Sequence, residues 1–190
     1  MPGNWSYIII HHTGAEEKDT AQVRRYHLSL GWQDIGYHYV IERDGKVVPG
    51  RSLELVGAHC KAAGMNQKGI GVALIGNMEN HPPLPAQEKA AVKLVQELME
   101  RYRVTLANVL GHKEVPGAAT ACPGRHFSMA AFRSQLEGAL RSQPEGSQVK
   151  IYRVQVGAYK IRKNAENMVE KLKRAGFPAI IVEGTMSSAP

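Results

Sequence analysis

Two short, almost wholly apolar runs constrain the fold of this chain most strongly. One is Trp5–His11, whose apolar centre Tyr7–Ile10 ends at the polar sequence His-His-Thr-Gly, and the other is Ile70–Ile75. Strands that are covered on both faces read as continuous apolar runs. The two runs therefore predict buried strands, and we expect Ile70–Ile75 to lie at the centre of a sheet.

Helical patterns alternate with strand patterns along the first 141 residues. The longest is Pro85–Tyr102, in which apolar residues recur at helical spacing. Its expected buried stripe consists of Ala91, Leu94, Val95, Leu98 and Met99. The other expected elements are helices at Thr20–Leu30 and Phe127–Arg141, strands at Tyr37–Glu42, Val47–Val48 and Val109–Leu110, and a loop at Gly57–Gly69. This alternation predicts an α/β fold with a mixed central sheet flanked by helices.

The composition changes after residue 141. Residues 142–149 are rich in Ser, Gln, Pro and Gly and predict a linker between a domain at 1–141 and a second unit. A strand at Lys150–Val156, a helix at about Arg162–Ala175 and a strand at Ala179–Val182 predict a small β-α-β unit over 150–184, with a tail at 185–190. A unit of about 35 residues is too small to bury a sheet face alone.

The formal net charge of the chain is +7. This charge favours contact with a polyanion, such as nucleic acid, an anionic wall polymer or acidic lipid, and a basic surface without a partner is an equal alternative. No stretch reaches the ~20 apolar residues of a membrane-spanning helix. Met1–Tyr7 lacks the pattern of a secretory signal. Two cysteines, Cys60 and Cys122, do not make a disulfide framework, and metal binding by one of them fits better.

Three candidate metal ligands stand at or after strand ends. His11 and His112 each end an expected strand, and Cys122 lies in a Thr-Ala-Cys-Pro-Gly loop. Strand ends of α/β sheets converge on one edge. Two imidazoles and one thiolate leave the fourth position of a zinc ion open, as catalytic sites do. By spacing alone the hypothesis is weak, because a histidine at a strand end is more often a hydrogen-bonded surface residue.

Six short motifs follow one another in order between residues 5 and 140. They are Tyr7-Ile-Ile-Ile-His-His-Thr13, Trp32-Gln-Asp-Ile-Gly-Tyr-His-Tyr-Val-Ile41, Gly57-Ala-His59, Ile70-Gly-Val72, Gly111-His-Lys-Glu-Val115 and Thr120-Ala-Cys-Pro-Gly124. Together they resemble the zinc N-acetylmuramoyl-L-alanine amidases of the type-2 amidase and peptidoglycan-recognition family, which includes phage lysozymes of the T7 kind. The resemblance implies a peptidoglycan hydrolase that cleaves the amide between N-acetylmuramic acid and the L-alanine of the stem peptide.

The resemblance also assigns the ligands of one zinc ion per chain. His11, and not His12, becomes the first ligand because the family ligand directly follows the apolar strand. His112 and Cys122 become the second and third. Zinc lowers the pKa of a bound water toward ~7 and polarises the scissile carbonyl.

Further site residues follow from the same motifs. Tyr37 matches the active-site tyrosine of the family and is expected to hydrogen-bond the water or the oxyanion, the alternative being a core tyrosine. Thr120 holds a position that is lysine in some members and threonine in others, and its hydroxyl is expected to donate to the oxyanion. Glu114 either orients a ligand or is a solvated carboxylate. The expected substrate-contacting residues are His38, His59 and Asn66.

A second resemblance covers the C-terminal unit. Tyr152–Tyr159, Leu172–Phe177 and Ala179–Val182 look like the first half of a SPOR domain, a peptidoglycan-binding module whose complete fold repeats this β-α-β unit. A half module needs a partner surface. We therefore expect it to dock on the amidase or to self-associate with another copy, the alternative being a remnant with no binding role.

The expected partner is bacterial peptidoglycan. No nucleic-acid partner is expected, because a basic balance without a recognisable motif is a weak footprint. A chain without a signal peptide is expected to be made in the cytoplasm and to reach the wall after release or export, as a phage or prophage endolysin or an autolysin. The alternative is a non-catalytic peptidoglycan receptor, although such members usually lack the cysteine ligand, and Cys122 is present.

Overall fold

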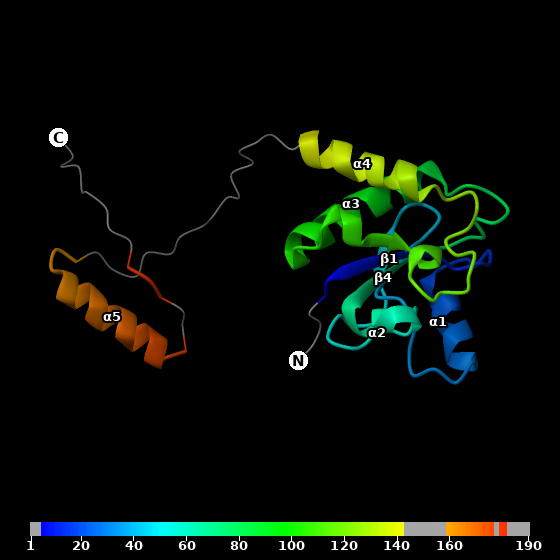
Figure 1. The fold of residues 1–190 in the computed structure, drawn as a ribbon. Helices are drawn as coiled ribbons and strands as arrows, with labels where there is room; N and C mark the ends of the chain where they lie inside the picture. Colours follow the sequence, from blue (N-terminus) through cyan, green and yellow to red (C-terminus); the bar gives the residue numbers. More distant parts are fainter. Residues whose placement is uncertain (1–4, 143–158, 177–178, 182–190) are drawn as a thin grey trace. The chain divides into compact units, whose positions relative to one another are not determined.

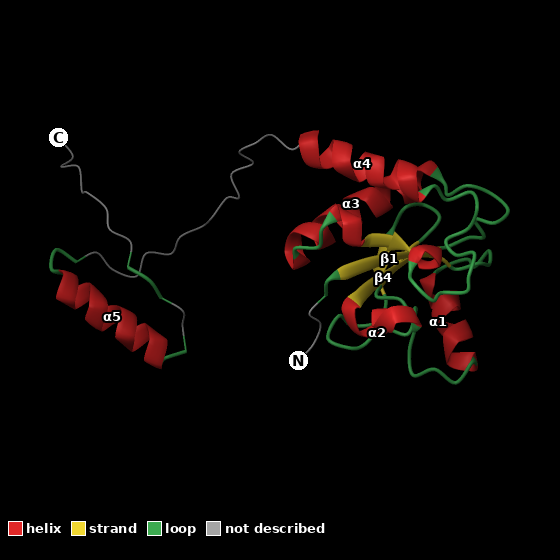
Figure 2. Ribbon diagram, in the orientation of Figure 1, coloured by secondary structure: helices red, strands yellow, loops and turns green. Residues whose placement is uncertain are grey.

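The computed structural model describes residues 5–142, 159–176 and 179–181. The chain forms two compact units, Met1–Glu145 and Gly146–Pro190. The first unit is a five-stranded mixed sheet covered by helices (Figures 1 and 2). This architecture confirms the α/β class with a mixed central sheet that the sequence predicts.

The sheet has the strand order β3-β2-β4-β1-β5. Its strands are β1 Tyr7–His12, β2 Tyr39–Ile41, β3 Val47–Pro49, β4 Gly69–Leu74 and β5 Val109–Gly111. Parallel pairing joins β1 to β4 and β5, and β2 to β4, while β2 and β3 form an antiparallel hairpin. Because β4 and β1 occupy inner positions, both are buried, as their apolar runs predict.

Four helices pack on this sheet. They are α1 Thr20–Ser29, α2 Met65–Lys68, α3 Pro85–Tyr102 and α4 Met129–Ser142, and short 3-10 turns occur at Ala62–Gly64, Leu106–Asn108 and His112–Glu114. The predicted helix at Pro85–Tyr102 is confirmed in both bounds, and its expected stripe is buried. The prediction of a plain loop at Gly57–Gly69 was wrong, since this segment contains a 3-10 turn and α2. A four-residue helix that begins after a left-handed Gly64 is too short to produce a periodic pattern.

The two faces of the sheet are covered by different helices. Ile8 and Ile10 of β1 pack in one core cluster with residues of α3 and α4. Ile9 points to the other face, where it packs with Met65 of α2 and with Cys60. Figure 2 shows α3 and α4 on one side of the strands and α1 and α2 on the other. Because side chains alternate along a strand, each residue at the end of β1 is committed to one of these two faces.

The second unit contains α5, Arg162–Arg174, which confirms the predicted helix. No residue of α5 is buried within the described part of the chain, and its apolar stripe, exemplified by Met168 and Leu172, is half-buried. The strand expected at Ala179–Val182 was wrong over residues 179–181, which are not in a strand. An apolar run supplies no paired neighbour by itself, and Ile180 is 82% exposed.

The predicted strand Lys150–Val156 lies outside the described residues. The predicted linker 142–149 begins at the last residue of α4, and its remainder also lies outside them. Among the described segments, no helix combines the length and the apolar character that crossing a membrane requires.

Candidate metal centre

His11 stands at the carboxyl end of β1, between β4 and β5. It shares the face of Ile9, because the two residues are two positions apart along the strand, and it is 1% exposed. His12 points to the opposite face, where its Nδ1 accepts a hydrogen bond from Met78 N at 3.0 Å. The alternation of the strand therefore separates the two neighbouring histidines and leaves only His11 on the side of the other expected ligands.

His112 and Cys122 meet His11 at this edge of the sheet. β5 pairs with β1, so His112, which directly follows β5, lies beside His11 with ring centroids 4.6 Å apart. Cys122 comes from the loop before α4, and its Sγ is 3.6 Å from His11 Nδ1. One ligand atom from each of the three residues lies within 4.8 Å of the other two. The structure thus brings together the three residues that the sequence predicts as ligands.

The backbone around Cys122 is held by several hydrogen bonds. Cys122 N donates to Thr120 Oγ1 at 3.1 Å, and Cys122 O accepts from Lys113 N at 2.7 Å. Cys122 Sγ accepts from His12 N at 3.4 Å, and Lys113 Nζ donates to Gly124 O at 3.2 Å. Thr120, an exposed residue, therefore orients the cysteine loop in this structure. Lys113 is a contributor that the sequence motifs did not single out.

The three groups fit a metal that prefers nitrogen and sulfur. A tetrahedral zinc ion with bonds of about 2.1 Å to nitrogen and about 2.3 Å to sulfur sets these two ligand atoms about 3.6 Å apart. His11 Nδ1 and Cys122 Sγ have this separation. Burial lowers the pKa of both His11 and His112, which keeps the rings neutral as metal binding requires. Burial also raises the pKa of the Cys122 thiol to about 12, so the thiolate needs a cation beside it.

The ring of Tyr37 lies beside the ring of His11. The two rings are 5.2 Å apart between centroids, and Tyr37 comes from the segment just before β2. Burial, followed by the charges of Cys122 and Glu17, raises the pKa of the Tyr37 hydroxyl above its ordinary value. The hydroxyl therefore stays protonated at neutral pH and is available as a hydrogen-bond donor.

The three expected substrate contacts lie on the same side of the sheet and are engaged with protein groups. His38 is 1% exposed, and its Nδ1 accepts from Gly71 N at 2.9 Å. Asn66 Oδ1 accepts from the backbone N of His59 and of Cys60, at 2.8 and 2.7 Å. Burial lowers the pKa of His38 to about 4 and that of His59 to about 3. Contact of these residues with substrate remains a prediction.

Glu114 links the end of β5 to α4 through hydrogen bonds. Its two oxygens accept from Arg133 Nη1 and Nη2 of α4, each at 2.8 Å, and Oε2 also accepts from Gly111 N at 2.8 Å. The Arg133 side chain holds the pKa of Glu114 below its usual value. No hydrogen bond joins Glu114 to the ring of His112 among the described contacts. Arg133 was not found from the sequence, because nothing local marks a partner 19 residues away.

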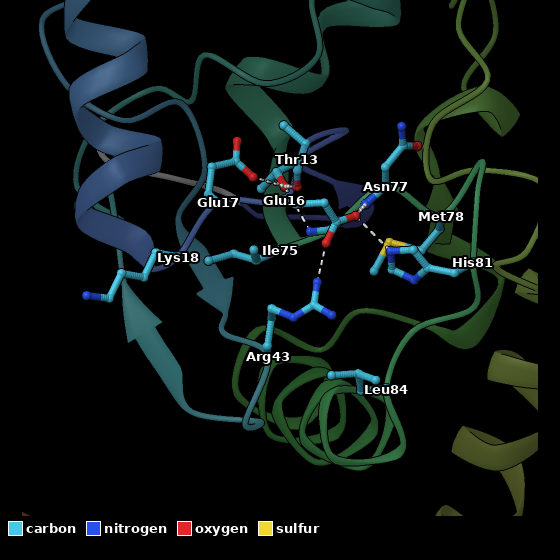
Figure 3. Close-up of polar contacts among 12 residues, drawn as sticks. Thr13, Glu16, Glu17, Lys18, Arg43, Ile75, Asn77, Met78, His81 and Leu84 are labelled. Carbon is cyan, nitrogen blue, oxygen red and sulfur yellow. Dashed lines mark hydrogen bonds and ion pairs between the residues drawn. The ribbon is translucent and has the colours of Figure 1, made fainter.

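Glu16, in the loop after β1, contacts residues of two other loops (Figure 3). Its Oε1 accepts from Asn77 N at 3.0 Å and from His81 Nε2 at 2.7 Å, and its Oε2 pairs with Arg43. Nearby, Thr13 Oγ1 accepts from Gly76 N at 3.0 Å. These contacts tie the loop after β1 to the loop after β4 and to the β2–β3 hairpin, and the sequence motifs did not reveal them.

Comparison with known families assigns the first unit to a family. Residues 1–125 match the family model described as N-acetylmuramoyl-L-alanine amidase. The chain therefore belongs to this amidase family. Residues 148–188 match the model of the SPOR domain.

The similar proteins are of two kinds. Peptidoglycan-recognition protein SC2 of Drosophila melanogaster is 36% identical over 132 residues, which cover 64% of this chain and 70% of that protein. The endolysin of Escherichia phage T7 is 36% identical over 107 residues, 54% of this chain and 67% of the endolysin. Among solved structures, the N-acetylmuramoyl-L-alanine amidase LysC from Clostridium intestinale URNW matches with a TM-score of 0.65 and 32% identity, over 72% of this chain and 87% of LysC.

Proposed function

We propose that this protein is a zinc-dependent N-acetylmuramoyl-L-alanine amidase that hydrolyses peptidoglycan. The observation that carries the proposal is the convergence of His11, His112 and Cys122, with ligand atoms within 4.8 Å of one another, in a chain of the amidase family. Two neutral imidazoles and one thiolate leave a fourth position of a tetrahedral ion for the reacting groups.

The chemistry divides between the metal and the side chains around it. Zinc in such a site supplies a water molecule of lowered pKa and polarises the carbonyl of the scissile amide. Tyr37, protonated and beside His11, donates a hydrogen bond toward the negative charge that develops on the carbonyl oxygen. Thr120 is a weaker candidate for a second donor, because a neutral hydroxyl provides less stabilisation than a cation would.

The second unit supports a wall-binding role for the whole protein. The match of residues 148–188 to the SPOR domain favours peptidoglycan as the partner of this unit too, and its half-buried apolar stripe on α5 favours self-association as a way to complete it. Anionic wall polymers are a further candidate, given the net charge of +7. The endolysin relatives favour action on the cell wall after release from the cell.

Peptidoglycan-recognition proteins among the relatives raise a second candidate, a receptor that binds peptidoglycan without cleaving it. Digestion of purified sacculi separates the two. The amidase proposal expects mass spectrometry to find fragments with a free L-alanyl amino terminus after incubation with the zinc-loaded protein, and none after treatment with a chelator. Cleavage by the metal-free protein would overturn the zinc dependence, and binding of sacculi without any cleavage would favour the receptor.

A further inference from the structure

His59 is a buried histidine behind the metal centre that the mechanism above does not use. We propose that His59 is a positioning residue, which holds His11 in the tautomer whose Nδ1 is free to bind metal. This inference rests on the proposed function. It departs from the expected role of His59 in contacting substrate, because both of its ring nitrogens face protein groups.

The hydrogen bonds of His59 determine where its protons lie. Its Nε2 is 3.0 Å from the carbonyl oxygen of Gly69, and its Nδ1 is 3.0 Å from Nε2 of His11. A carbonyl oxygen only accepts, so Nε2 of His59 carries a hydrogen. In a neutral ring Nδ1 is then an acceptor, and the proton between the two histidines belongs to Nε2 of His11.

The consequence is a defined tautomer at the metal centre. With its proton on Nε2, neutral His11 has an unprotonated Nδ1, and this atom lies 3.6 Å from Cys122 Sγ. The other arrangement would put a second proton on His59 and one on Nδ1 of His11, which would block the metal. That arrangement places a positive ring at a buried position, and removal of a charge from water opposes it.

Two glycines lie close against the ring of His59. A Cβ added at Gly71 would lie 2.5 Å from His59 Cδ2, and one added at Gly57 would lie 2.6 Å from the same atom. Asn66 Oδ1 fixes the backbone of His59 through the 2.8 Å bond to its N. The glycines and Asn66 thus account physically for the Gly-Ala-His and Ile-Gly-Val motifs as parts of a slot for an imidazole.

Two substitutions in the full-length protein separate a positioning role from simple packing. In His59→Asn the side-chain amide occupies the place of Nδ1 and can accept from His11. In His59→Gln the amide reaches the place of Nε2, keeps the contact with Gly69 O and leaves His11 Nε2 without its acceptor. Loss of a residue that hydrogen-bonds a metal ligand costs about 10–100-fold in metal affinity. His59→Gln should therefore bind zinc about 10–100-fold more weakly than the wild type, and His59→Asn should bind it more tightly than His59→Gln. Competition with a chelator measures both affinities. His126→Gln, a matched change at an exposed histidine, should leave the affinity unchanged.

The tautomer itself is measurable by long-range ¹H–¹⁵N NMR on the zinc-free protein. The wild type should show His11 protonated at Nε2, and His59→Gln should show a redistribution toward Nδ1. A wild-type His11 protonated at Nδ1, or a folded His59→Gln that binds zinc as tightly as the wild type, would overturn the inference. If His59→Gln fails to fold, the wild-type spectrum still decides. Failure of the wild type itself to bind zinc would overturn the proposed function instead.

Discussion

A group of three buried histidines and a fourth histidine, the half-buried His81, differ in the groups that surround their rings. The buried group, His11, His38 and His59, is bound to backbone groups and to itself. His81 is half-buried, and its Nδ1 faces Pro82 O at 2.8 Å while its Nε2 faces Glu16. Both neighbours of His81 only accept, which favours the doubly protonated, positive ring.

The difference shows that the surroundings of each histidine, rather than its residue type, determine its pKa and charge. Desolvation keeps the three buried rings neutral, which suits a metal ligand and the residues that support it. The hydrogen bonds to Pro82 O and Glu16 raise the pKa of His81, which suits an ion pair that joins loops.

Loss of a proposed zinc ligand should have the largest effect on activity and zinc content. We expect Cys122→Ser to abolish release of L-alanyl termini from sacculi, a larger effect than the ~10–100-fold that an outer partner costs, because it removes one of the three protein ligands. Zinc content and product release measure it. Cys60→Ser, a matched change at the other free buried cysteine, should keep both, and the reverse pattern would contradict the assignment of Cys122.

Removal of the Tyr37 hydroxyl should lower the rate and spare the metal. Loss of one donor to an oxyanion costs about 10²–10³-fold in kcat, and we expect a fall of this order in Tyr37→Phe with unchanged zinc affinity. Tyr39→Phe removes a half-buried hydroxyl from β2, where the ring packs against the opposite core, and should retain full activity. Equal losses in both variants would refute the role of Tyr37.

A methyl group at Gly71 should disturb the buried group through packing. Overpacking a filled site costs about 1–3 kcal/mol, and we expect Gly71→Ala to lower the free energy of unfolding by this order, because its Cβ would lie 2.5 Å from the His59 ring. Chemical denaturation followed by the fluorescence of Trp5 and Trp32 measures it. Gly138→Ala in α4 meets no atom within 4 Å and should be neutral or stabilising, by up to about 1 kcal/mol.

The smallest effect is the pH dependence of the free energy of unfolding, to which His38 and His81 contribute with opposite signs. His38, with its pKa lowered from 6.5 to about 4, opposes folding increasingly as the pH falls through this range. His81, with its pKa raised, stabilises the fold below 6.5 and loses this contribution as the pH rises through its folded pKa. NMR titration should find His38 near 4 and His81 above 6.5.

The variant His81→Gln isolates the contribution of the pair that His81 forms with Glu16. Because the pKa of Glu16 is lowered, its contribution to stability is complete above the ordinary carboxylate pKa of 4.5 and is lost as the pH falls through the folded pKa. His81→Gln should therefore reduce the free energy of unfolding slightly near pH 5.5 and not at pH values above the folded pKa of His81. A loss independent of pH would show that His81 acts by packing.

Long or motif-bearing features were predictable from the sequence, and short or long-range ones were not. α3 was predicted in both bounds because its 18 residues carry a repeated apolar stripe. α2 was missed because four residues give no period. The ligand types were predicted from the motifs, whereas Arg133, Glu16 and Lys113 were not, since their partners are far away in sequence or are backbone groups.

The sequence by itself determined the order of the five strands and the longer helices along the chain and the nitrogen and sulfur donors, because these follow from local periodicity and residue chemistry. Only the tertiary structure decided which atoms face one another. His59 and Cys122 are 48 and 111 positions from His11, yet they contact its two ring nitrogens. The orientation of that ring depends on packing between distant segments, and local sequence carries no record of it.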